Sequence, residues 1–329
     1  MKYFALTAVL LSTSFAVDVE AQNLTLATGS SGGTYYPVGV ALSTLVSEQL
    51  ADQSVRMSPI TTGGSAENIE LIARDEAQVA IMFGIYGRDG YRGIGLREGR
   101  PPVEGLRSIM SLWPDYDQFV IHKDYAKTGT LSDMAELGGA FSIGPRNSGT
   151  EGTTRLLLEA VDIDPENAFS VTNMQYNAAA EAFQNGRIAG MSAAGGIPTP
   201  AVSQIFSTSA KDTVILEVTD DQVEQISEAT DGLFARVEIP AGTYPNQNKA
   251  IQTIMQPNFL AVHADVPEEV VYAMTKSIFE NLDVLHAASS AAKVISLDTA
   301  LDGLPVPLHP GSERFYAEQG ITIPDRLQN

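Results

Sequence analysis

Segments with the spacing of β-strands alternate with segments with the spacing of α-helices along most of this chain. Short apolar runs at residues 24–28, 55–60 and 78–83 fit strands. Residues with helical periodicity separate these runs, beginning with Val38 and Leu42. Strands that alternate with helices build layered α/β domains around a largely parallel sheet. The fold class predicted from the sequence is therefore α/β.

A second run of alternating segments begins near residue 115, after Trp113 and Pro114, so we expect two lobes. From residue 267 onward the pattern is helical, without enough strands for a third domain. This last stretch must pack on the first lobe, and the chain must then cross between the lobes twice. The expected parts are residues 22–117 with 263–329 for lobe 1, 118–262 for lobe 2, and hinge strands near 113–120 and 255–263.

The first 21 residues have the order of a cleavable export signal. Lys2 precedes an apolar run at residues 3–11, and small residues follow up to Ala16 and Ala21. Cleavage after Ala21 is preferred, because a strand-like segment follows it directly, and Ala16 is the alternative. No later segment has the roughly 20 apolar residues that a membrane span needs. We therefore expect a periplasmic protein with a signal peptide that is removed.

The composition excludes several classes of function. The chain carries 40 Asp and Glu against 20 Lys and Arg, a formal net charge of −20, which argues against a nucleic-acid partner. It has no cysteine, which excludes disulfides, thiolate zinc sites and cysteine nucleophiles. The four histidines lack metal-ligand spacing, and the acidic run at residues 217–228 lacks the pattern of a calcium loop. We therefore expect neither a metal nor a cofactor.

The most informative segment is a loop of glycine and hydroxyl residues between the first strand and the first helix. In open α/β sheets ligands bind at the carboxyl ends of strands. Glycines allow close approach of the backbone, and free N–H groups at a helix start attract anions. A glycine-rich turn that only connects is the alternative. The residues of this loop predicted to bind ligand are Ser30, Ser31, Gly33, Thr34 and Tyr35.

Other predicted strand ends carry similar residues, in both lobes. In the second lobe Arg146 stands beside the start of a helix, where it would form a carboxylate receptor. A surface ion pair is the alternative role for Arg146, as expected in an acidic protein. The further residues predicted to bind ligand are Gly64, Ser65, Gly84, Arg146, Asn147, Ser148, Gly149, Thr150, Gln175 and Ala194.

Enzyme motifs are incomplete in this chain. Residues 29–33 match the GxSxG pattern of a nucleophile elbow, but such an elbow follows several strands and this one follows the first. The loop has no lysine for a phosphate loop and no GxGxxG spacing for a dinucleotide. We therefore predict no catalytic residue. An exported serine hydrolase that uses Ser31, and a surface antigen or adhesin on the same fold, remain as alternatives.

Five segments, in chain order, resemble the TAXI branch (TRAP-associated extracytoplasmic immunogenic proteins) of the solute-binding proteins of TRAP transporters. They are residues 29–39, 62–68, 148–151, 239–244 and 299–311. The resemblance implies a two-lobe periplasmic-binding-protein fold with two hinge crossings and a ligand cleft between the lobes. It also implies docking on a TRAP-type membrane permease driven by an ion gradient, with glutamate, glutamine or related dicarboxylates as ligands.

The chain departs from the family pattern at Arg146, which is inserted beside the predicted anion site of the second lobe. This arginine favours an anionic ligand if it faces the cleft. The expected function is therefore a monomeric solute receptor that captures a small organic anion, either a dicarboxylate or a glutamate-like molecule, and delivers it to the permease subunits.

Overall fold

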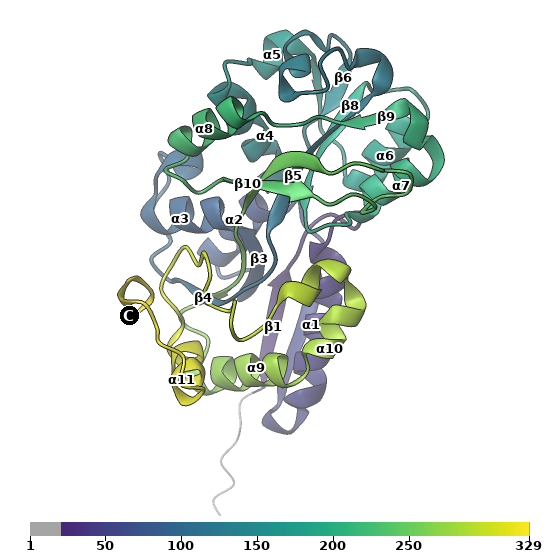
Figure 1. Cartoon of the computed structure of the whole chain (residues 1–329). Coiled ribbons are helices and arrows are strands. Elements are labelled where there is room, and N and C mark those ends of the chain that lie inside the picture. The colour runs from purple at the N-terminus through teal and green to yellow at the C-terminus, as the bar shows by residue number, and fades with distance from the viewer. Residues whose placement is uncertain (1–20, 329) are drawn as a thin grey trace, which may run out of the picture.

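The computed structural model describes residues 21–328, which form two lobes joined by two crossings of the chain (Figure 1). The predicted export signal at residues 1–21 lies outside the described residues, except for Ala21. Each lobe has its own β-sheet with helices packed against it, so the predicted α/β two-lobe fold is confirmed. No helix in the described part of the chain is both long and apolar enough to span a membrane.

Lobe 1 is built on a five-stranded mixed sheet. Its strands are β1 (Gln22–Ala27), β2 (Val55–Ile60), β3 (Val79–Phe83), β4 (Leu106–Ser111) and β12 (Asn258–His263). They lie in the order β2-β1-β3-β12-β4. β1 is parallel to β2 and β3, whereas β12 is antiparallel to β3 and β4. Every residue of β3 is buried, as expected for an apolar strand inside a sheet with helices on both faces.

The helices of lobe 1 come from both ends of the chain. They are α1 (Tyr35–Gln49), α2 (Ser65–Ala73), α3 (Gly84–Arg92), α9 (Glu268–Glu280), α10 (Leu282–Ala288) and α11 (Pro310–Glu318). α9 and α10 pack against α1, and α11 packs against α9 and β4. The chain after β12 therefore completes lobe 1.

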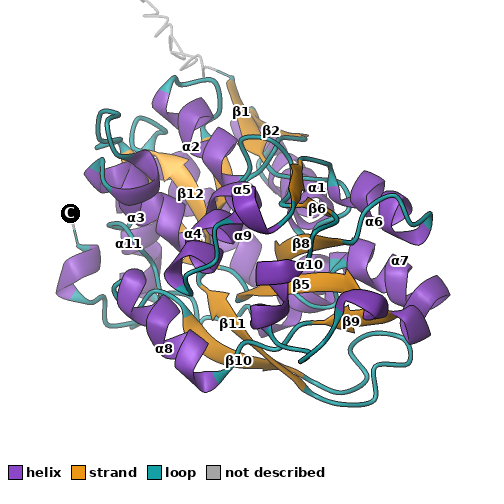
Figure 2. Cartoon of the chain, turned by 90° about the horizontal axis from the view of Figure 1, so that it is seen from above, coloured by secondary structure: helices purple, strands orange, loops and turns teal. Residues whose placement is uncertain are grey.

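Lobe 2 contains the middle of the chain. Its strands are β5 (Asp115–His122), β6 (Ala140–Ser142), β7 (Ser170–Thr172), β8 (Gly190–Gly195), β9 (Thr213–Ile215), β10 (Ala235–Ile239) and β11 (Ile251–Gln256). They follow the order β10-β11-β5-β8-β6-β7, with β9 paired to β5. The helices are α4 (Gly149–Ala160), α5 (Pro165–Ala168), α6 (Tyr176–Gln184), α7 (Pro200–Ser209) and α8 (Asp220–Ala229) (Figure 2).

Short 3₁₀ turns occur in both lobes. They are η1 (Ala51–Gln53), η2 (Gly95–Arg97), η3 (Lys123–Tyr125), η4 (Leu131–Glu136), η5 (Ala210–Asp212), η6 (Ser290–Val294) and η7 (Asp325–Leu327). They lie in connecting segments, and η6 belongs to the segment that leads from α10 toward α11.

The two crossings lie earlier than the predicted lobe boundaries. β4 belongs to lobe 1 and β5 to lobe 2, so the first crossing is at residues 112–114, before the boundary drawn at 117. β11 pairs with β5 in lobe 2, whereas β12 pairs with β3 and β4 in lobe 1, so the second crossing is at Pro257, before the boundary drawn at 262. The hydrogen-bonded pairing of a strand decides to which lobe the strand belongs, and a single sequence does not show this pairing.

The structure also differs from the sequence pattern at α3 and in the sheets. α3 contains Gly84, Gly87 and Gly90, which lower helix propensity, so the sequence does not predict it. These glycines serve close packing: a Cβ on Gly87 would lie 2.6 Å from the ring of Phe259, and one on Gly90 would lie 2.7 Å from Ile69. Both sheets are mixed rather than largely parallel, because β12 and β11 return antiparallel to their neighbours.

Candidate functional site

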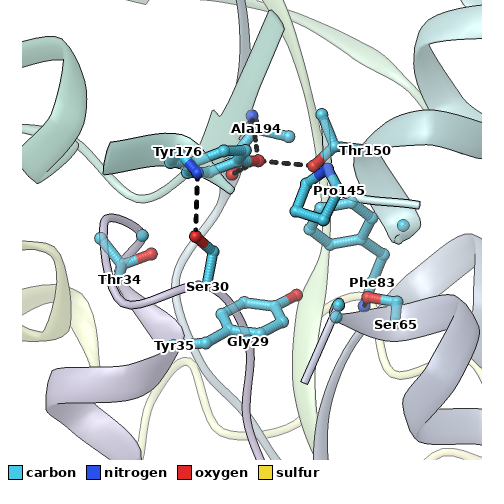
Figure 3. Close-up of a pocket in the computed structure, with 14 residues that line it drawn as sticks. Gly29, Ser30, Thr34, Tyr35, Ser65, Phe83, Pro145, Thr150, Tyr176 and Ala194 are labelled. Atoms are coloured by element: carbon cyan, nitrogen blue, oxygen red, sulfur yellow. Dashed lines mark hydrogen bonds between the residues drawn. The ribbon is translucent and has the colours of Figure 1, made fainter. Parts of the chain in front are cut away.

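A cavity lies between the lobes, where the carboxyl ends of strands meet the starts of helices (Figure 3). Its volume is about 30 Å³, which corresponds to roughly two water positions. Its lining residues, from both lobes, are Gly29, Ser30, Gly33, Thr34, Tyr35, Gly63, Gly64, Ser65, Phe83, Pro145, Gly149, Thr150, Tyr176 and Ala194. None of these lining residues is Asp, Glu, Lys, Arg or His.

Four helices begin at the wall of this cavity. Tyr35 is the first residue of α1, Ser65 of α2, Gly149 of α4 and Tyr176 of α6. The first N–H groups of a helix have no partner inside the helix, and the helix dipole places partial positive charge at this end. Two of these helices belong to each lobe, so both halves of the cavity favour an anion.

Hydrogen bonds join the lobes next to the cavity. The Ser30 hydroxyl oxygen accepts the main-chain N–H of Tyr176 at 3.1 Å (Figure 3). The Thr34 hydroxyl oxygen accepts the main-chain N–H of Gly196, also at 3.1 Å. Each bond has one partner in the loop before α1 and the other in lobe 2. The structure is therefore that of the closed arrangement, with the lobes in direct contact.

Tyr176 forms the roof of the cavity and connects two elements of lobe 2. Its hydroxyl lies 2.5 Å from the Thr150 hydroxyl oxygen and 3.0 Å from both the main-chain oxygen and nitrogen of Ala194. Burial raises the pKa of Tyr176 well above its usual range, so the hydroxyl stays neutral. These bonds hold the first turn of α4 against β8 and fix the shape of the roof (Figure 3).

Glycine permits the close contact of the lobes at the start of α4. A Cβ on Gly149 would lie 2.9 Å from the ring of Phe83 and 2.9 Å from the Cβ of Ser65, both in lobe 1. Gly64 has φ of +116°, a backbone conformation that side chains disfavour. Without side chains at these two positions, main-chain N–H groups of both lobes can reach a ligand directly.

Two buried acids lie behind the cavity wall. The Tyr35 hydroxyl donates to the Asp115 carboxyl oxygen at 3.3 Å. Asp115 and Asp117 are both almost fully buried, and neither oxygen of Asp117 has a hydrogen-bond partner among the described residues. Burial, and then the neighbouring Asp117, raise the pKa of Asp115 well above its usual range. Burial raises the pKa of Asp117 to about 8, so this carboxyl is mostly protonated at neutral pH.

The cavity gathers many of the residues predicted from the sequence. Those that line it are Ser30, Gly33, Thr34, Tyr35, Gly64, Ser65, Gly149, Thr150 and Ala194. Predicted residues outside the lining are Ser31, Gly84, Arg146, Asn147, Ser148 and Gln175. Two of these support the walls: Ser148 accepts the N–H of Glu151 and caps α4, and Gln175 is the residue that precedes α6.

Arg146 does not line the cavity. Its side chain is exposed, and it forms no ion pair with any acid in the described part of the chain. Pro145, its neighbour, lines the cavity instead, and the exposed Asn147 donates its main-chain N–H to the Glu151 carboxylate at 2.6 Å. Arg146 therefore stands beside the rim, and neither of the two roles considered for it is realised in this closed arrangement.

Ser31 lacks the surroundings of a catalytic nucleophile. Its side chain is exposed, and its hydroxyl oxygen accepts the side-chain amide of Asn177 across the lobes at 3.2 Å. No histidine in the described range bonds to it: His122 contacts the Phe183 carbonyl, and His309 contacts that of Ala264. A serine needs an adjacent base for activation.

The sequence did not single out several functional residues. The lining residues Gly29, Gly63, Phe83, Pro145 and Tyr176 were not predicted, although each adjoins a predicted residue or loop. Asp115 and Asp117 lie in the hinge strand predicted near 113–120, without a predicted role in the site. The available signal was two acids at alternate positions beside a strand, which places both on one face of the sheet.

Solved structures of similar fold were found. A binding protein of an ABC phosphonate transporter from Pseudomonas aeruginosa has a TM-score of 0.54 and 12% identity, covering 83% of this chain and 79% of that one. A Prochlorococcus marinus protein, solved with methylphosphonate, has a TM-score of 0.50 and 12% identity over 84% and 89%. A Bordetella bronchiseptica protein has a TM-score of 0.52 and 14% identity over 93% and 91%.

These likenesses identify the fold as that of two-lobe substrate-binding proteins. The sequence matches the NMT1-like family over residues 26–320, a range that spans both lobes. This range begins in β1 and ends just after α11, and it includes every residue that lines the cavity. The chain therefore belongs to the NMT1-like family.

Proposed function

We propose that this protein is an extracytoplasmic receptor that captures a small organic anion and delivers it to a membrane permease. The observation that carries the proposal is the convergence of four helix N-termini, two from each lobe, on one closed cavity. Helix dipoles, together with the first-turn N–H groups that Ser30 and Ser148 do not already bond, hold anions without a formal positive charge in the lining. The absence of charged side chains among the lining residues also suits release of the ligand.

Binding works by selection of the closed arrangement. The ligand touches both lobes only when the cleft is closed, so its binding energy shifts the equilibrium between the open and closed states. The bonds from Ser30 to Tyr176 and from Thr34 to Gly196 form only on closure and add to this shift. The closed form then presents one joined surface to the permease.

We infer that the ligand is a dicarboxylate or a glutamate-like molecule. The N-termini on opposite walls offer a place for a carboxylate in each lobe. A molecule of this size needs more room than the roughly two water positions of the fully closed cavity, so the lobes stand further apart when it is bound. Arg146 at the rim supplies local positive charge on a strongly acidic protein, which favours the approach of an anion.

The partner we propose is the permease of a TRAP transporter, because the five motifs resemble the TAXI branch of its receptors. The export signal, with cleavage after Ala21, would place the mature protein in the periplasm. The solved ABC-type binding proteins share its fold only, so an ABC-type permease is the alternative partner. Deletion of each candidate permease gene, followed by uptake of labelled ligand, distinguishes the two.

A thermal-shift screen of small carboxylates, phosphonates, neutral sugars and amines tests the proposal. We expect carboxylates to raise the melting temperature of the protein. Ser30→Ala should reduce the ligand-induced rise and leave the ligand-free melting temperature nearly unchanged, because the Ser30 bond belongs to the closed state. Ser207→Ala, on the outer face of α7, is the matched control and should behave as wild type. Stabilisation by neutral or cationic solutes alone would refute the anion proposal.

The hydrolase alternative has its own test. A fluorophosphonate probe labels serines that are activated as nucleophiles. We expect no labelling of Ser31, because its hydroxyl oxygen accepts a hydrogen bond from the Asn177 amide and has no base beside it among the described residues. Labelling that disappears in Ser31→Ala would instead establish the enzyme.

A further inference from the structure

A second and larger cavity lies at the hinge. Its volume is about 440 Å³, against about 30 Å³ for the cavity in the cleft. Volumes of 300 to 1,000 Å³ with mainly apolar walls are typical of small-molecule sites. We call it the hinge cavity. Its lining residues are Ser111, Leu112, Trp113, Pro114, Gly232, Leu233, Met255, Pro257, Val294, Thr299, Asp302 and Gly303.

Both lobes and both crossings contribute to the hinge cavity. Trp113 and Pro114 belong to the first crossing, and Pro257 is the second. Leu233 comes from lobe 2, and Val294 comes from the C-terminal part of lobe 1. A rotation of the lobes about the crossings therefore changes the distance between its walls. A molecule that contacts walls from both lobes in the closed arrangement favours that arrangement when rotation of the lobes separates those walls.

Trp113 separates the hinge cavity from the cleft. It lines the hinge cavity, and its ring packs edge-on against the ring of Tyr35, with centroids 6.3 Å apart. Tyr35 lines the cavity in the cleft and is the first residue of α1. The Trp113 side chain therefore lies between the two cavities and contacts a residue that lines the cleft. It is also the single tryptophan of the chain, so its fluorescence reports on both.

The lining identifies the chemistry of the occupant. Leu112, Leu233, Met255 and Val294 supply apolar surface, and Val294 is 51% exposed. Asp302 is the one charged residue of the lining, and it forms no ion pair with another described residue. The protein's charge of −20 attracts cations as well. The walls come from several short separate segments, which offer no continuous strand edge or helix groove for a peptide.

We propose that the hinge cavity binds a compact apolar molecule with one cationic group, and that its occupancy stabilises the closed arrangement of the lobes. The apolar body contacts Leu233 and Val294, and the cation pairs with Asp302. This site is separate from the anion site in the cleft, so the proposal stands whether or not the cleft ligand is an anion.

The probe for the binding test is 1-aminoadamantane, with 1-adamantanol as its uncharged counterpart. Titration of Trp113 fluorescence and calorimetry should both show saturable binding of the amine. Val294→Lys and Asp302→Asn should each weaken it at least tenfold. Val284→Lys, at an exposed valine of α10 outside the cavity, is the matched control and should change affinity less than twofold.

The cysteine-free sequence allows a direct test of closure. Ser31→Cys with Asn177→Cys places the only two thiols of the chain on opposite lobes, where the native side chains lie 3.2 Å apart. We expect the amine to accelerate disulfide formation between them at least threefold, and Val294→Lys to abolish this effect. Absence of saturable amine binding, equal affinity of the amine and the alcohol, equal effects of Val294→Lys and Val284→Lys, or an unchanged disulfide rate would each overturn the proposal.

Discussion

The carboxyl of Asp117 should make the protein less stable as the pH rises from 5 to 7. Burial raises the pKa of Asp117 to about 8 in the folded chain, whereas an aspartate in an unfolded chain titrates at about 3.9. Between these two values the folded state holds a proton that the unfolded state releases. Stability is therefore greatest at low pH and falls as pH rises toward the folded pKa, by about 1.4 kcal/mol per pH unit.

The substitution Asp117→Asn removes this dependence with little change in shape. Across two pH units the titration accounts for about 2.7 kcal/mol, so the stability of the variant relative to wild type should rise by about that amount from pH 5 to pH 7. For a chain of this size that corresponds to a difference of about 5 °C in melting temperature. Asp115, whose pKa is also raised by burial, leaves part of the slope in the variant.

The assay is urea unfolding followed by circular dichroism at pH 5, 6 and 7. Asp133→Asn is the control with the opposite sign. Burial alone would raise the pKa of Asp133, but N–H groups of Thr128 and Gly129 bond to its carboxylate and lower it instead. Asp133→Asn should therefore destabilise the protein by the same amount at pH 5, 6 and 7, because this contribution is lost only as the pH falls below the unfolded-state pKa of about 3.9. Parallel profiles for wild type and Asp117→Asn would refute the assignment of a buried, protonated carboxyl.

Three further outcomes follow from the site and a fourth from the N-terminal sequence. Gly149→Ala should weaken anion binding at least tenfold in calorimetry, because its Cβ would lie 2.9 Å from Phe83 across the lobes; unchanged affinity would contradict the close contact. Tyr176→Phe should lower the free energy of unfolding by about 1 to 3 kcal/mol in urea, because it removes the bonds to Thr150 and Ala194; a smaller loss would mean that water replaces them. Arg146→Glu should slow ligand association in stopped-flow with little effect on dissociation; an effect confined to dissociation would place Arg146 on the bound ligand. The intact mass of the exported protein should match a start at Gln22, and a start at Val17 would move the cleavage to Ala16.

The strand-to-helix loops of the site were predictable from local patterns. Ser30, Thr34 and Ser65 stand between a strand-like run and a helix-like run, and in α/β folds such junctions meet at one edge of the sheet. The proposed preference for an anion rests on the same local fact, because every helix start exposes N–H groups. These features depend on residues close together in the chain, which a single sequence displays.

Other features depend on contacts between distant residues. Tyr176 reaches the cavity because α6 packs behind β8, and the Ser30 hydroxyl meets it across 146 positions of sequence. The predicted carboxylate receptor at Arg146 turned out to be an exposed side chain, because the loop presents Pro145 and the α4 N-terminus to the cavity instead. No local sequence pattern shows whether this loop turns Arg146 or Pro145 toward the cavity.

Periodicity and the residue types at strand-to-helix junctions were thus enough to predict the layered α/β class, the two lobes and the small-residue loops that line the cavity. Strand pairing set the crossings at residues 112–114 and at Pro257, and it buried Asp115 and Asp117 beside them. Propensity and hydrogen bonding within a helix act over a few residues, so they can be read along the chain. Pairing, burial and the pKa shifts that burial causes arise only when distant segments exclude water together.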